Sequence, residues 1–252
     1  MSVKNYYEYI NENVIKKEDM GLDWRLHLAV KLGNVNEVKE LLNAGADIES
    51  EDEQGWTPLT SACGHGNQQM VEILLKLNAK TEHSCKYTGS TPLMISCMNG
   101  YVDIAQILLD YGADTGAKDN SGLSTLHNAC CYSKVGIVKL LLNNGADIEM
   151  RTDTKNGIGR NTPIMVAIFW DNDDVVKLLL EYGANIKTHN STHQSPLDFK
   201  CKGVWKQKYT QELIITGQPH NIKFFHDKIG ILLSLKKKYK EVIEMSELGI
   251  FG

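Results

Sequence analysis

Cysteine is the residue type in this chain that could do the most chemistry, because its thiol can act as a nucleophile, a metal ligand or half of a disulfide. The 252 residues contain six cysteines. The sequence contains no Cys-x-x-Cys spacing that would suggest a zinc site. The C-terminal region contains Cys201, His220, His226 and Asp227, which are the residue types of a thiol nucleophile with a base and an orienting carboxylate. The elements that hold these residues decide whether such chemistry is available.

Start and stop signals for helices alternate along the chain. A hydroxyl residue at the cap and a proline at the first helical position both favour a helix start, and they recur as Thr57-Pro58, Thr91-Pro92, Thr162-Pro163 and Ser195-Pro196, with Ser124-Thr125 in the remaining place. A left-handed C-cap is predicted after each leucine-rich run, at Gly45, Asn78, Gly112, Gly145 and Gly183. The period is about 33 residues, which indicates a stacked repeat array.

Each unit predicts two short helices. The second helix carries apolar residues at i, i+3 and i+4, as in Val71, Leu74 and Leu75, and they form one buried stripe. Neither helix is long enough to be stable alone, so each unit must pack against its neighbours. The expected fold is therefore all-α.

The segment Asp52-Glu53-Gln54-Gly55-Trp56-Thr57-Pro58-Leu59, with Gly-Ala-Asp at 45–47, 112–114 and 145–147, resembles the ankyrin-repeat family. The resemblance covers residues 22–201 and implies an ankyrin-repeat solenoid of about five to six repeats, including degenerate caps. It also implies helix–turn–helix units joined by β-hairpin-like fingers. His27 and His127 stand at the family's usual histidine position. Thr60, Met94 and Met165 replace it elsewhere, so its hydrogen bonds between units are expected to be missing there.

The segments outside the array are expected to be covers for its ends. Residues 1–21 predict an N-terminal capping helix, since Tyr6, Ile10 and Val14 have helical spacing. Residues 202–252 predict a C-terminal helical cap or extension, with a last helix that begins near Pro219 and carries the basic run 236–240. A solvated face is the expected role of that run. An alternative function stays open, in which the extension after residue 201 carries a second docking or enzymatic activity.

The positions of the cysteines within the repeat argue against a chemical role for most of them. Cys63, Cys97, Cys130 and Cys201 fall at the repeat position that Val30 and Ile168 also occupy, which is typical of packing between helices. Stacked units lie about 10 Å apart, too far for disulfides. Cys131 falls at an exposed position of the family pattern and Cys85 falls in a finger. Phosphate-binding glycine loops and nucleophile elbows are also missing from the sequence. We therefore expect neither an enzyme nor a cofactor or metal.

Composition and charge limit the classes of partner that the chain is expected to bind. The chain is 42% hydrophobic and 23% charged with a net charge of −4, which is typical of a soluble globular protein and does not favour nucleic-acid binding. No stretch approaches the roughly 20 apolar residues of a membrane helix. A cytoplasmic monomer is expected, in a host cytoplasm if the source is a parasite or a virus. Its partner is expected to be another protein.

The candidate binding residues are those that caps and packing do not require. At the finger and inner-helix positions of the concave face they are Trp56, His65, Tyr87, Met98, Leu123, Tyr132 and Trp170. Exposed aromatic residues are common anchors of interfaces. Phe169 has the same register, with the alternative that it packs against a neighbouring unit.

One finger is longer than the others. The connection from Arg151 to Thr162 exceeds its equivalent from Glu51 to Thr57 by five residues, and insertions in repeat proteins enter loops on one face. Arg151, Lys155 and Arg160 are therefore expected to form a basic flank of the binding face, opposite the acidic segment at residues 49–53.

Overall fold

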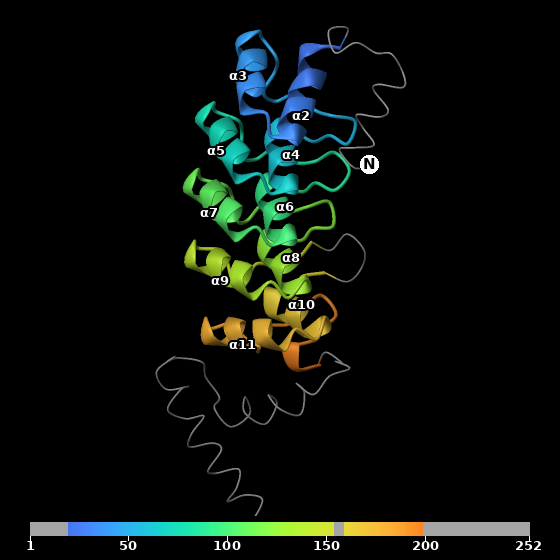
Figure 1. The fold of residues 1–252 in the computed structure, drawn as a ribbon. Coiled ribbons are helices and arrows are strands. Elements are labelled where there is room, and N and C mark those ends of the chain that lie inside the picture. Colours follow the sequence, from blue (N-terminus) through green and yellow to red (C-terminus); the bar gives the residue numbers. More distant parts are fainter. Residues whose placement is uncertain (1–19, 154–158, 199–252) are drawn as a thin grey trace, which may run out of the picture.

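The computed structural model describes residues 20–153 and 159–198, which form a stack of helix pairs with finger-like loops along one side (Figure 1). The first helix of each pair lies next to the fingers, and these inner helices are α2 (Leu22–Leu32), α4 (Pro58–His65), α6 (Pro92–Asn99), α8 (Thr125–Cys131) and α10 (Pro163–Phe169). The outer helices are α3 (Val35–Asn43), α5 (Gln68–Lys76), α7 (Val102–Asp110), α9 (Val135–Asn143) and α11 (Asp173–Glu181). The expected all-α ankyrin-repeat solenoid is confirmed.

The helix ends follow the expected signals. Thr57 and Thr91 accept hydrogen bonds from the amides of Thr60 and Met94, with prolines at the first helical position of α4 and α6. The residues after the outer helices have positive φ, including Asn78 at 66° where the other units have glycine. A short 3-10 helix, η2 (Pro196–Asp198), packs on α10 and begins the sixth unit.

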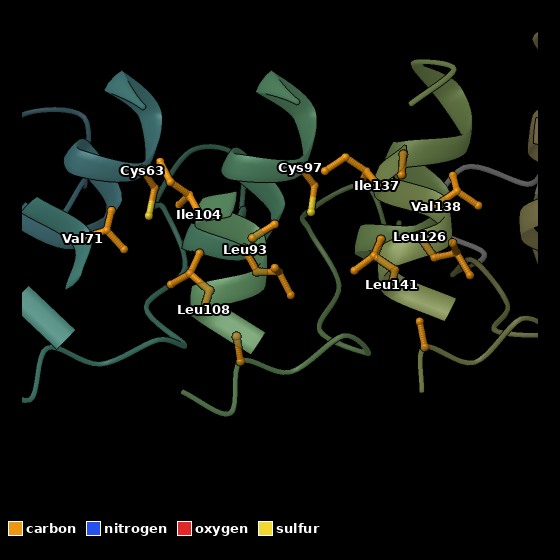
Figure 2. Close-up of a cluster of buried hydrophobic side chains, with 14 of the residues drawn as sticks. Cys63, Val71, Leu93, Cys97, Ile104, Leu108, Leu126, Ile137, Val138 and Leu141 are labelled. Carbon is orange, nitrogen blue, oxygen red and sulfur yellow. The ribbon is translucent and has the colours of Figure 1, made fainter. Parts of the chain in front are cut away.

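The core is a continuous column between units rather than a centre within one unit. Each inner helix contacts the inner helix of the next unit, and the outer helices from α5 to α11 do the same. Leu93, Leu126 and Leu141 are completely or almost completely buried in this column (Figure 2). Because each unit shares its core with two neighbours, the stack fixes the relative positions of all side chains on the finger side.

The fingers are hairpin-like turns. The amide of Asp52 donates to the carbonyl of Trp56 at 2.9 Å, and that of Asp119 donates to Leu123 at 3.0 Å. Within residues 20–153 and 159–198, only the single bridge between Lys118 and Ser124 has β-sheet pairing. Neighbouring fingers are also joined, since the amide of Asp153 donates to the carbonyl of Gly122 at 3.2 Å.

Several sequence predictions fall outside the described residues. They are residues 1–19 of the capping helix, the centre of the long finger at 154–158, the end of the array with Cys201, and the extension over residues 202–252 with His220 and His226.

Candidate functional site

The aromatic residues of the finger side do not share one environment. The ring of Trp56 lies over Gly64 of α4, so close that a Cβ at residue 64 would be 2.8 Å from its Cζ3 atom. Trp56 is consequently only half-exposed, and a side chain at residue 64 would have to displace its ring. This contact places the residue before the Thr-Pro pair and the end of the inner helix on one continuous surface.

Larger exposed areas occur two and three units further along the stack. Tyr132, Phe169 and Trp170 are 54%, 65% and 57% exposed. Phe169 and Trp170 form an edge-to-face pair with ring centroids 5.5 Å apart and an interplanar angle of 86°. The thiol of Cys131 on α8 interacts with Trp170 beside α10. The alternative that Phe169 packs away against a neighbouring unit is therefore wrong.

Tyr87 belongs to a finger tip and is 67% exposed. Its carbonyl accepts a hydrogen bond from the side-chain amide of Asn120 in the next finger at 3.0 Å, and Nζ of Lys86 lies 6.0 Å from its ring centroid. The backbone of this residue is thus anchored to the neighbouring unit, while its ring extends toward solvent and remains available for contact.

The other uncharged candidates line the same side with less exposed area. Met98 and Leu123 are half-buried, and His65 is exposed at the end of α4, where its Nδ1 donates to the carbonyl of Ser61 at 2.7 Å. We define the recognition strip as the surface formed by these residues and the aromatic ones, namely Trp56, His65, Tyr87, Met98, Leu123, Tyr132, Phe169 and Trp170.

The basic flank is partly engaged in structure. The guanidinium of Arg151 donates to the carbonyls of His189 and Arg160, at 2.8 and 3.3 Å, and so ties the base of the long finger to the next one. Arg160 itself is exposed with φ of 62°. Lys155 lies outside the described residues.

The acidic flank is also partly engaged. Asp52 pairs with Lys31 at 3.5 Å and accepts from the amides of Gln54 and Trp56. Glu51 lies 3.5 Å from Nε2 of His83. Glu53 is exposed at the finger tip. Part of the acidity expected to orient a partner therefore shapes the finger.

A ladder of carboxylates joins successive units, and our sequence reasoning missed it. Oxygens of Glu49, Glu82 and Glu149 accept hydrogen bonds from backbone amides of the following unit at 2.8, 2.9 and 2.6 Å, respectively. All three stand two residues after the last residue of a Gly-Ala-Asp motif or its equivalent, so the recurrence of glutamate in that register was the available signal. Gly116 occupies the same position in the third unit.

The cysteines at the shared repeat position, Cys63, Cys97 and Cys130, have unreactive thiols. Cys63, Cys97 and Cys130 are buried and unbridged. Burial raises the pKa of the Cys63 and Cys97 thiols to about 12 and that of Cys130 well above its ordinary value. Figure 2 shows Cys63 and Cys97 among the aliphatic side chains of the core. The expectation that these three cysteines serve packing is confirmed.

Residues 20–153 and 159–198 contain no group of three or more His, Cys, Asp or Glu side chains that could hold a metal ion. None of their helices has the length and apolar character needed to cross a bilayer.

Comparison with known proteins agrees with this geometry. A family model for ankyrin repeats (3 copies) matches residues 26–119 and 112–190. A fowlpox virus protein described as an ankyrin repeat protein is 30% identical over 75% of this chain and 57% of its own length. Human SH3 and multiple ankyrin repeat domains protein 2 is 30% identical over 73% of this chain, and human neurogenic locus notch homolog protein 1 is 30% identical over 56%.

The chain spans only part of each of these relatives, since the matches cover 10% of the human SH3 and multiple ankyrin repeat domains protein and 5% of the human notch homolog. The matched segment, residues 26–190, is more than half of the 252 residues, and it contains nearly all of the helix pairs described above. The chain belongs to the ankyrin-repeat family.

Proposed function

We propose that this chain is a noncatalytic adaptor that binds a partner protein through the recognition strip. Ankyrin repeats are generally protein–protein interaction modules, and the strip lies on the side where fingers and inner helices meet. The observation that carries the proposal is the exposure of Tyr132, Phe169 and Trp170, each more than half exposed on a rigid array. Aromatic side chains of this kind lose little conformational entropy on binding and bury large apolar areas.

The geometry of the stack supports a partner that contacts several units. Trp56 and Trp170 belong to the second and fifth helix pairs, which at about 10 Å per unit separates them by roughly 30 Å. A surface of that length accommodates a standard interface of about 800 Å² on each partner. Glu53 near one end and Arg160 near the other give the strip opposite charges, which would orient a dipolar partner and speed its association.

The proposal places the protein in the cytoplasm as a monomer, with no nucleic-acid partner. The alternative, a second docking or enzymatic activity in residues 202–252, concerns residues that the structure does not describe. No observation on the described residues favours an enzymatic activity over binding.

Affinity capture with quantitative mass spectrometry tests the proposal. Wild-type protein and the double variant Tyr132→Ala/Trp170→Ala are used as baits, with Lys39→Ala/Lys139→Ala on the outer helices as the matched control. We expect a protein captured by wild type and by the control to be depleted with the aromatic variant. Equal capture by all three baits would show that binding uses another face.

A further inference from the structure

One part of the recognition strip is more apolar than the rest. We define the aromatic patch as Tyr132, Phe169 and Trp170 together with Cys131, the residue before Tyr132. Its members come from the ends of α8 and α10. The Cys131 thiol interacts with Trp170, Phe169 and Trp170 form a ring pair, and Tyr132 is the residue that follows Cys131. Contiguous exposed apolar area of this kind marks a surface that something covers.

The charges that follow Trp170 in the sequence are mainly negative. Asp171, Asp173 and Asp174 lie one to four residues after it, and Lys177 pairs with Asp174 at 3.0 Å. Basic residues near the patch in the sequence also include Lys134, two residues after Tyr132, and Arg160, which lies in the long finger before α10. Over residues 20–153 and 159–198, thirteen basic residues stand against twenty-two acidic ones, a net charge of −9. An occupant with apolar side chains followed by positive charge would therefore match both the patch and its surroundings.

The chain itself contains such a segment. Phe225, Ile229 and Leu232 recur at helical spacing in residues 219–240, and Lys236, Lys237 and Lys238 follow them. This segment has six lysines and one aspartate, a net charge of +5 with neutral histidine. It combines the apolar anchors and the basic charge that the patch calls for.

The fold brings the chain to the right place. The described residues end with η2, which packs on α10, the helix that ends at Phe169 beside Trp170. Residues 199–218 then separate the array from the segment, and twenty residues can span up to about 70 Å when extended. A tether of that kind gives the segment an effective concentration of the order of millimolar at the patch, so a weak intrinsic affinity suffices.

We propose that residues 219–240 dock on the aromatic patch of the same chain and cover it when no partner is bound. The docked segment competes with a partner protein for the α8–α10 end of the recognition strip, so the array is autoinhibited. The competition rests on the proposed function, whereas the docking does not. The two are therefore tested separately, the docking without any partner present.

Hydrogen exchange of the full chain, read by mass spectrometry, tests the docking. In wild type, backbone amides of residues 219–240 are expected to exchange slowly. In Phe169→Ala/Trp170→Ala they are expected to exchange at least about tenfold faster, because two anchors of the contact are removed. Tyr111→Ala, which truncates an exposed aromatic residue at the end of the outer helix α7, is the matched control and should leave the exchange unchanged.

A second variant keeps the test valid if the array does not tolerate the first one. Lys236→Glu/Lys237→Glu/Lys238→Glu changes only the segment, and it should raise the exchange rate of residues 219–240, with a smaller difference from wild type at high salt.

Three results would overturn the proposal. The first is fast exchange of the segment in wild type. The second is slow exchange that neither the aromatic nor the lysine variant affects, as a cap on another face of the array would give. The third is protection that rises with protein concentration, which would identify a second copy of the chain as the occupant.

Discussion

Replacing His127 by methionine should change the pH dependence of stability in a calculable way. His127 is completely buried in α8. The amide of Ser124 donates to its Nδ1 at 3.3 Å, so the proton is on Nε2, which donates to the carbonyl of Asn161 at 3.0 Å. Methionine is a suitable replacement because Met94 and Met165 occupy the equivalent position in the third and fifth units.

Burial lowers the pKa of His127 from 6.5 to about 4, and the nearby Lys118 acts in the same direction while Asp119 opposes it. Between these two pKa values the unfolded chain binds a proton that the folded chain does not. Stability that depends on this histidine is therefore fully present above the unfolded pKa and is lost as the pH falls toward the folded pKa. At pH 5 the loss amounts to about 2 kcal/mol.

Near neutral pH, the hydrogen bond from His127 to Asn161 makes wild type more stable than the methionine variant. His127→Met removes the bond to the carbonyl of Asn161, which keeps a second donor in the amide of Thr152, so the cost is about 1 kcal/mol. The variant should thus be less stable than wild type by about 1 kcal/mol at pH 7 and more stable by about 1 kcal/mol at pH 5, with the curves crossing near pH 6.

Urea unfolding at a series of pH values between 7 and 5, followed by circular dichroism, measures the difference. Titration of every other group, including His27, whose pKa burial also lowers, largely cancels in the comparison. Parallel stability curves without a crossing would refute the reasoning, because they would mean that protonation of His127 does not oppose folding.

Three further perturbations follow from the structure. Gly122→Ala should destabilise the array by about 2 kcal/mol more than Gly145→Ala. Both glycines have positive φ, but only a Cβ at residue 122 would meet the neighbouring finger, 2.5 Å from Cβ of Asp153. Equal urea midpoints of the two variants would contradict this prediction. Gly116→Glu should complete the carboxylate ladder, because the new carboxylate can accept a hydrogen bond from the amide of Asp147. It should raise the free energy of unfolding by about 1 kcal/mol more than Gly116→Ala does. Equal stability of the two variants would show that the ladder does not stabilise the array. Cys63 and Cys97, whose pKa is raised to about 12, should resist iodoacetamide at neutral pH until the chain is unfolded; labelling of the folded protein at the unfolded rate would contradict their burial.

Much of the fold could be predicted because its signals are local. Thr57 and Thr91 cap helices through their own neighbours three residues on, and the positive φ of Asn78 depends on its own cap position. Repetition then strengthened these weak signals, since a hydroxyl residue recurred at the helix start in each unit after the first. The cysteine column followed from the same register, because equivalent positions in a stack have equivalent surroundings.

The site was predicted less completely because it depends on contacts between units. Sequence register placed Phe169 on the strip, but its exposure depends on how its ring packs against Trp170. Arg151 was expected to face a partner, whereas its guanidinium donates to the carbonyl of residue 160 in its own finger and to that of residue 189 in the next finger. Such partners are distant in sequence and are set by the stacking, which a single unit does not encode.

The central claim is that partners bind the recognition strip, and the affinity of one captured partner for single-site variants tests it most directly. Isothermal titration of the purified partner should give a binding free energy for Trp170→Ala that is weaker by about 2 kcal/mol, roughly 30-fold in Kd. Lys39→Ala and Lys139→Ala should keep the wild-type fold and bind the partner with the wild-type affinity. If Trp170→Ala and Tyr132→Ala keep full affinity while the outer-helix variants lose it, the partner binds the opposite face of the stack and the account is wrong.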